Sequence, residues 1–161
     1  MVQTAKQFSI KVNSKPARVA QVVTALAKQR INITAVTVAD HKNEHIIRML
    51  TDNLRQTASI LNSLNIPFEE NEVVLVEMRN QPGALAQVME LLAEEHISID
   101  YAYCAAGERN GKSTGVFKVS NPVKCMKVLA ESPATRAKRE GHGGRGWGRT
   151  GRTRESTPGA E

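Results

Sequence analysis

Hydrophobic and polar residues alternate between Phe8 and Val12, a period of two that is typical of a strand with one buried face. From Val19 to Leu26 the apolar residues take the spacing of an amphipathic helix. Two runs of mainly apolar residues follow at 33–38 and 46–50, and the polar segment at 41–44 between them predicts a hairpin turn. The pattern therefore predicts a strand, a helix and a hairpin in that order.

A second helix and a closing strand complete this pattern. Asp52 and Asn53 can cap a helix whose apolar residues run from Leu54 to Leu64. Residues 66–70 then predict a fourth strand. The order βαββαβ is that of the ferredoxin-like arrangement, in which four antiparallel strands lie under two helices.

The same pattern occurs twice, because the chain resembles itself at an offset of 66 residues. The segment KPARVAQVVTALAKQRINIT lies over QPGALAQVMELLAEEHISID, so that Pro16 meets Pro82. Further on the offset becomes 68, where Asn53 meets Asn121, and the two extra residues fall in the loop at 106–113. We therefore expect an α+β fold of two ferredoxin-like βαββαβ modules in tandem, with antiparallel sheets and helices on one face.

The second copy departs from the pattern at its end. Its fourth strand is due near Ala134, yet the last twenty-eight residues contain seven of the chain's eleven glycines and no apolar alternation. Such a segment predicts disorder rather than a strand. Three explanations remain open: a three-stranded second sheet, a fourth strand from another chain, or a final segment foreign to the original module. The predicted organisation is a first module at 1–70, a second at 71–131 that lacks its fourth strand, and a Gly/Arg-rich tail at 132–161.

Composition and charge narrow the class of protein. The 161 residues are 40% hydrophobic, enough for one ordinary core or two small ones that support each other. Of the net charge of +6, half lies in residues 131–161, so the body of the chain does not predict a nucleic-acid partner. The first residues lack the apolar run of a signal peptide, and no stretch is long enough for a membrane span, so we expect a soluble cytoplasmic protein.

Several motifs resemble chemical sites but fit ordinary structure better. The string His41-Lys42-Asn43-Glu44-His45 matches a zinc-peptidase motif, yet it falls where a hairpin turn is expected. The segment at 107–113 resembles a phosphate-binding loop with one residue too few and a strand after it. Cys104 and Cys125 sit in apolar surroundings and are interpreted as buried thiols. We expect no catalytic residues, no metal and no cofactor.

The segment VLVEMRNQPGALAQVMELLAEEHISIDY resembles the signature of the ACT domain family: a strand, a polar turn with Pro-Gly, then a helix. The first half, with Ala17 in place of the glycine, resembles it more weakly. Together the two copies cover about residues 6–130. The resemblance implies modules that pair side by side and amino-acid effectors that bind at the pairing interface, near the turn before the first helix.

That turn supplies the candidate ligand-binding residues. A helix N-terminus presents unpaired N–H groups that suit a carboxylate, and a glycine there allows a close approach to the backbone. An ordinary strand-to-helix turn is the alternative. The candidates are Asn80, Gln81, Pro82, Gly83, Ala84 and Leu85 in the second module, Asn13, Ser14, Lys15, Pro16 and Arg18 in the first, and Tyr103 for reading the ligand's side chain.

These observations predict a non-catalytic regulatory protein that binds a free amino acid and forms a homodimer. One alternative is a regulatory subunit of an amino-acid biosynthetic enzyme, which predicts a stable complex with a partner enzyme. An alternative of a different class is an RNA-binding ferredoxin-like protein, which requires exposed aromatic residues on the central strands. The chain's aromatic residues do not form that signature.

Overall fold

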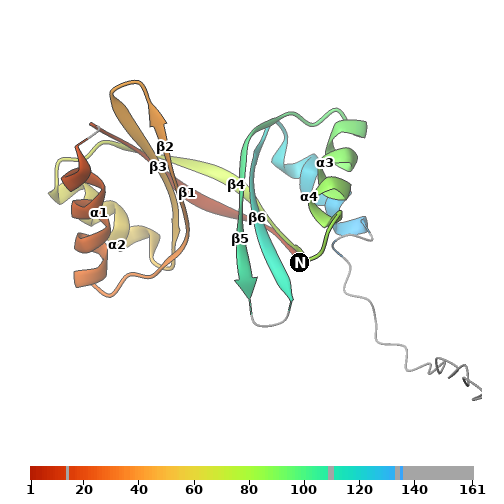
Figure 1. Cartoon of the computed structure of the whole chain (residues 1–161), viewed down its shortest axis with the longest axis horizontal. Helices are drawn as coiled ribbons and strands as arrows, with labels where there is room; N and C mark the ends of the chain where they lie inside the picture. The colour runs from red at the N-terminus through yellow and green to blue at the C-terminus, as the bar shows by residue number, and fades with distance from the viewer. Residues whose placement is uncertain (14, 109–110, 133–134, 136–161) are drawn as a thin grey trace, which may run out of the picture.

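The computed structural model describes residues 1–13, 15–108, 111–132 and 135. Its elements alternate as the repeat predicts (Figure 1). The first half holds β1 (Val2–Asn13), α1 (Pro16–Lys28), β2 (Ile33–His41), β3 (Glu44–Thr51) and α2 (Leu54–Ser63). The second half holds β4 (Phe68–Arg79), α3 (Ala84–Glu94), β5 (Ile99–Glu108), β6 (Lys112–Val119) and α4 (Pro122–Glu131). The predicted fold class, two ferredoxin-like modules of antiparallel strands and paired helices, is confirmed.

The predicted caps and hairpin turn are present. The side chain of Asn53 accepts a hydrogen bond from the amide of Gln56, and that of Asn121 accepts one from Lys124, at 3.0 and 2.9 Å. Each bond satisfies an amide that the first turn of a helix leaves unpaired. β2 ends at His41 and β3 begins at Glu44, so the predicted turn joins the two strands.

The two modules share one sheet. Its six strands run in the order β2-β3-β1-β4-β6-β5. The strands β1 and β4 are twelve residues long and serve both halves. In β1, residues 8–13 pair with β3 of the first half, while residues 2–10 pair with β4. Residues 74–79 of β4 pair in turn with β6 of the second half.

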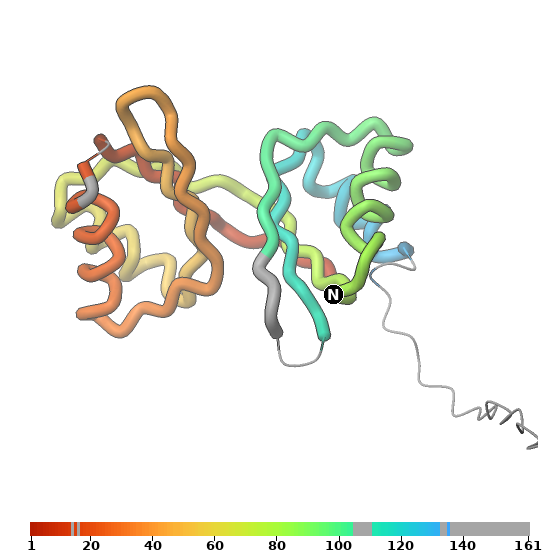
Figure 2. Tube along the Cα trace, viewed as in Figure 1, coloured from red at the N-terminus to blue at the C-terminus, as the bar shows by residue number. Residues whose placement is uncertain are grey.

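The place of the missing fourth strand is filled from the beginning of the chain. In a ferredoxin-like module the fourth strand lies beside the first, and beside β4 in the second half lie residues 2–7 of β1. None of the three explanations drawn from the sequence included a strand from the chain's own first residues. In Figure 2 the two long strands run between the halves and connect them.

The pairing of β1 with β4 has the symmetry of the repeat. Lys6 lies opposite Glu72 in the register, and the same two residues are related by the offset of 66. A local two-fold axis therefore passes between them. Each long strand is the first strand of its own module and takes the fourth position in the other.

Each half has its own core beneath its helices. The first core contains Phe8, Ile10, Val22, Leu26, Ile47, Met49 and Leu61, all without exposed surface. The second contains Val74, Val76, Val88, Leu92, Phe117, Cys125 and Leu129, likewise without exposed surface. Figure 1 shows α1 and α2 at one end of the molecule and α3 and α4 at the other.

The face of the sheet that carries no helices curls onto itself. Arg48 on β3 and Tyr101 on β5 have three strands between them in the sheet order, yet the guanidinium carbon lies 4.1 Å from the centre of the ring. A small third core of Leu50, Val73 and Val116 lies on this helix-free face. The helix-free surfaces of the two halves are therefore in contact with each other.

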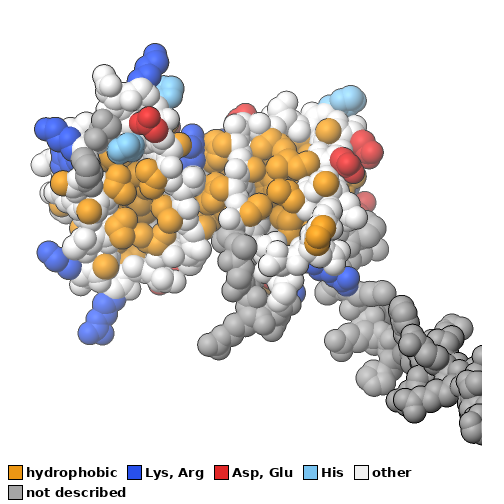
Figure 3. Space-filling view, viewed as in Figure 1, with side chains coloured by type: hydrophobic (Ala, Val, Ile, Leu, Met, Phe, Trp, Pro, Cys, Tyr) orange, Lys and Arg blue, Asp and Glu red, His pale blue; other side chains and the backbone are white. Residues whose placement is uncertain are grey.

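The outer strands leave apolar side chains uncovered. Val36 and Val38 on β2 lie opposite Met49 and Ile47 of β3, whose side chains are buried under the helices, yet both valines are 48% exposed. β2 and β5 are the two edges of the sheet. Figure 3 shows hydrophobic side chains gathered on each half on the same side of the molecule.

One prediction about the cysteines is wrong. Cys125 is buried in the second core, as expected, and burial raises the pKa of its thiol to about 11. Cys104 is exposed. It lies on the edge strand β5 at the position that Val38 occupies on β2, where neither half covers its sheet edge completely.

Candidate functional site

The turn before α3 places the predicted ligand-binding residues between two strands and a helix. β4 ends at Arg79, and the amide of Asn80 donates to the carbonyl of Gly111 at 2.8 Å. The amide of Gln81 donates back to Arg79 at 3.0 Å, which starts the turn. Gly83 is the N-cap of α3, so the helix itself begins at Ala84.

Gly83 has the left-handed backbone that its residue type allows. Its φ is +88°, a conformation that costs other residues about 1–2 kcal/mol. Pro82 therefore precedes the cap and does not lie in the first helical turn. In α1 the equivalent Pro16 is itself the first helical residue, and Ala17, at the glycine's position, is helical. The two turns differ because alanine does not readily take the backbone of Gly83.

The start of α3 is open. No side chain caps this helix, and a Cβ atom added at Gly83 would meet nothing within 4 Å. The amides of Leu85 and Ala86 have no hydrogen-bond partner among the described residues. Asn80, Gln81 and Leu85 are exposed around this backbone. Unpaired amides at the positive end of a helix dipole form a surface that suits an anion.

The turn before α1 offers a ligand less access to unpaired backbone amides. Lys15 is the N-cap with extended backbone and no side-chain cap, and its amide donates to Asn13 at 2.7 Å. The guanidinium of Arg18 donates to Gln21 of the same helix at 2.9 Å, so this side chain already has a partner. Ser14 and the side chain of Pro16 lie outside the described residues.

Tyr103 lies at the crossing of the two halves, in a cluster around Gln7. The hydroxyl of Tyr103 donates to the Gln7 side-chain oxygen at 2.9 Å, and the Gln7 nitrogen donates to the hydroxyl of Tyr101 at 2.6 Å. Gln7 has no exposed surface. Burial is the largest influence on Tyr103 and raises the pKa of its hydroxyl well above the usual range. The sequence showed Gln7 only as one polar position of an alternating strand.

Two hollows of similar size lie on the helix-free face. The first, of about 330 Å³, is lined by residues that include Lys11, Arg48, Glu69 and Tyr101. The second, of about 320 Å³, is lined by residues that include Glu77 and Val116. Each draws its lining from both halves of the chain, which sequence spacing did not indicate.

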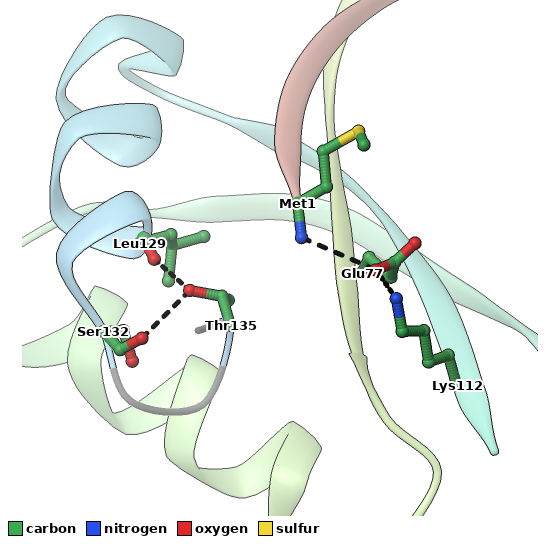
Figure 4. A network of polar contacts seen from close by, with 6 residues as sticks. All are labelled: Met1, Glu77, Lys112, Leu129, Ser132 and Thr135. Atoms are coloured by element: carbon green, nitrogen blue, oxygen red, sulfur yellow. Dashed lines mark hydrogen bonds and ion pairs between the residues drawn. The ribbon is translucent and has the colours of Figure 1, made fainter. Parts of the chain in front are cut away.

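The charged group of the second hollow is paired within the protein. Glu77 accepts a hydrogen bond from the ammonium of Lys112 at 2.5 Å and lies 3.8 Å from the amino group of Met1 (Figure 4). The hydrogen bond from Lys112 is the main reason that the pKa of Glu77 is lowered. This carboxylate therefore has its counter-charges in place.

Of the predicted tail, the structure describes Ser132 and Thr135. The hydroxyl of Thr135 donates to the carbonyl of Leu129 and lies 3.1 Å from that of Ser132, which closes the end of α4 (Figure 4). The expectation of disorder for the tail at 132–161 otherwise falls on residues 133, 134 and 136–161, which lie outside the described residues.

The match to a family model decides the family. The model for an ACT domain pair matches residues 3–136, which is most of the chain. The protein belongs to the ACT domain family. ACT domains are regulatory, non-catalytic modules, and the resemblance noted in the sequence is confirmed.

Solved structures agree with the ACT fold. A protein from Bacteroides thetaiotaomicron is 32% identical with a TM-score of 0.75, over 81% of this chain and 89% of that one. The ligand-free regulatory subunit of aspartate kinase from Thermus thermophilus gives a TM-score of 0.59 at 14% identity, over 81% and 95%. Aspartate kinase from Synechocystis gives 0.52 at 22% identity, over 84% of this chain and 28% of the kinase. No curated protein sequence matches the chain.

The other motifs noted in the sequence of this ACT pair fall on ordinary structural elements where the structure describes them. Within the described ranges no group of three or more His, Cys, Asp and Glu side chains is placed to hold a metal ion. In the zinc-like string, Nδ1 of His45 lies 3.7 Å from a carboxylate oxygen of Asp40 across the β2–β3 hairpin. The strand expected after the phosphate-loop-like segment is β6, while residues 109 and 110 lie outside the described part of the chain. No described helix is long and apolar enough to span a membrane.

Proposed function

We propose that this ACT pair is a non-catalytic regulatory protein that binds a free amino acid at the turn before α3. The observation that supports this most directly is the open, left-handed cap at Gly83, with unpaired amides behind it. The ligand's α-carboxylate meets those amides, and the side chains of Asn80 and Gln81 can accept from its ammonium group. The turn before α1 is a second candidate of the same kind, with less access to its backbone.

The proposal includes a homodimer formed through the sheet edges. Val36 and Val38 expose apolar surface beside an unpaired strand edge, and such an edge is a template for another strand. The hydrophobic patches of both halves lie on the same side of the molecule, so one partner copy can cover both (Figure 3). Leu85, at the start of α3, is also exposed, so a partner copy that covers the second half can contact the α3 turn through this side chain.

The aromatic side chains that the structure describes do not support an RNA-binding function. Phe8 and Phe117 are fully buried, and Tyr101 and Tyr103 are hydrogen-bonded to Gln7. Stacking of bases requires aromatic faces exposed on the central strands.

Ligand binding is tested by thermal melting of the full chain with each common amino acid. A ligand at 100 times its Kd stabilises the folded state by about 2.7 kcal/mol. We expect one amino acid or a related pair to raise Tm, and Gly83→Val to abolish this ligand-induced rise. The valine side chain strains the cap and occupies the open space in front of it.

The matched control is Ala17→Val, which places the same side chain at the equivalent position of the first turn. Because Gly83→Val also lowers Tm without ligand, the comparison uses the shift that the ligand causes. A rise that survives in Gly83→Val but disappears in Ala17→Val would move the site to the first turn. No rise with any amino acid would contradict the proposal and favour a subunit that acts only with a partner enzyme.

The dimer is tested by sedimentation. We expect the wild-type chain to sediment as a dimer and Val36→Lys as a monomer, because a buried lysine at the edge would lose its hydration. Val123→Lys, at an 80% exposed position on α4, is the matched control and should remain dimeric. A wild-type chain that remains monomeric at about 100 times the protein concentration used for thermal melting would contradict the proposed dimer.

A further inference from the structure

The two hollows on the helix-free face are related by the internal two-fold axis. At the repeat offset of 66, Lys11 corresponds to Glu77 and Tyr101 to Ala35. At the offset of 68 that applies after the first hairpin, Arg48 corresponds to Val116. Every pair has one member in the first hollow and the other in the second. The two hollows therefore occupy equivalent positions in the two halves but are lined by different side chains.

We call the first hollow the charged hollow, because its lining includes Lys11, Arg48 and Glu69. None of these three side chains forms an ion pair with a described residue. In the second hollow, by contrast, Glu77 is held by Lys112. The carboxylate of the second hollow is therefore neutralised within the protein, whereas the charged side chains of the charged hollow are available to a ligand.

Arg48 is fixed in place but incompletely bonded. Its guanidinium lies over the ring of Tyr101 at 4.1 Å, an arrangement that holds it by cation–π attraction. Its Nε atom is shielded from solvent and has no hydrogen-bond partner. A buried donor without a partner costs free energy that an added acceptor would recover.

The other side chains define the rest of the ligand. Ile46 and the ring of Tyr101 are half-buried and supply apolar contacts. The ring of Phe68, although this residue also lines the hollow, packs edge-on against Phe8 in the first core. Glu69 and Asn71 supply acceptors, and Lys11 a second cation at the exposed side. A volume of about 330 Å³ lies at the lower end of the range for small-molecule sites.

We propose that the charged hollow binds a small carboxylate with an apolar body. Arg48 and Lys11 meet the carboxylate, and Ile46 and Tyr101 contact the apolar part. This site is separate from the α3 turn and does not depend on it. Since Arg48 belongs to β3 and Tyr101 to β5, an occupied hollow ties the first half of the chain to the second.

The test is an NMR titration of the isotopically labelled full chain with sodium 3-phenylpropionate and, separately, with L-phenylalanine. We expect amide shifts to change around Lys11 and Asn71 and not around Glu77 in the equivalent hollow. Arg48→Gln should raise the Kd of 3-phenylpropionate at least tenfold, because charge-assisted hydrogen bonds are lost. Lys11→Gln, at an exposed position that the fold does not need, should raise it about threefold.

Gln3→Ala changes the residue that corresponds to Glu69 in the second hollow and should leave Kd unchanged. Glu69→Gln separates two sources of the carboxylate. If it weakens L-phenylalanine alone, the hollow accepts amino acids; if it affects neither probe, the hollow accepts simple carboxylic acids. The proposal is overturned if neither probe changes these shifts at a probe concentration of about 10 mM. It is also overturned if both cation variants keep the wild-type Kd, or if shifts change only at residues 80–85, a result that leaves the α3 site standing.

Discussion

Replacing Ala5 with proline is expected to destabilise the protein by about 3 kcal/mol, whereas replacing Thr4 with proline should cost less than about 1 kcal/mol. The two residues are neighbours in β1, and both belong to the segment that pairs with β4. Their amides point in opposite directions. The pair of variants therefore tests whether the second half of the molecule depends on the first residues of the chain.

The directions follow from the register. Met1 lies opposite Glu77 at the end of the ladder, and its carbonyl accepts from the Glu77 amide at 2.8 Å. In an antiparallel pair, hydrogen-bonded and non-hydrogen-bonded positions alternate. The amide of Ala5, opposite Val73, therefore points to β4, and that of Thr4 points to the open edge, where no described strand pairs with it.

Urea unfolding of both variants, followed by circular dichroism, measures the difference in free energy. Ala5→Gly and Thr4→Gly control for changes of side chain at the same positions. Equal losses in the two proline variants would mean that the pairing of β1 with β4 is not what stabilises the second half.

The second large effect is expected at Gln7. Changing it to leucine should destabilise the protein by about 2 kcal/mol, because two tyrosine hydroxyls lose their partner in a shielded place. Adding Tyr101→Phe and Tyr103→Phe removes those hydroxyls as well. Because an apolar replacement of all partners can be nearly neutral, the triple variant should recover most of the loss.

Chemical unfolding of the single, double and triple variants gives the coupling between the three side chains. Ser9→Ala is the matched control, since Ser9 shares with Gln7 only a long contact of 3.4 Å. It should change the free energy of unfolding by less than about 0.5 kcal/mol. A triple variant as unstable as Gln7→Leu alone would show that these hydrogen bonds do not explain the effect.

The sequence predicted most of the local structure correctly. Helical spacing and the repeat located the helices in the described part of the chain, and Asn53, with its counterpart Asn121 in the repeat, was identified as a cap. These features depend on neighbouring residues, so they can be read from the order of side chains. The repeat also indicated Gly83 as the residue that makes the second turn different from the first.

Other features escaped prediction because they depend on residues far apart in the chain. Cys104 was taken for a buried thiol because its neighbours in the sequence are apolar, but it is exposed on the edge strand β5. The charged hollow joins Arg48 with Tyr101, fifty-three residues away, across a face that curls only in the folded sheet. Gln7 gained its importance through the same curling.

By itself the sequence determined two ferredoxin-like modules, their order, the family to which they belong and the open turn at Gly83. Local periodicity, capping and the internal repeat carry that information. Only the tertiary structure decided that residues 2–7 complete the second half and that the two predicted sheets form a single six-stranded sheet. It also decided that two equivalent hollows form between the halves of the chain. The reason is physical. An unpaired edge of β4 would be unfavourable, and the segment that pairs with it is the beginning of β1, more than sixty residues earlier in the chain.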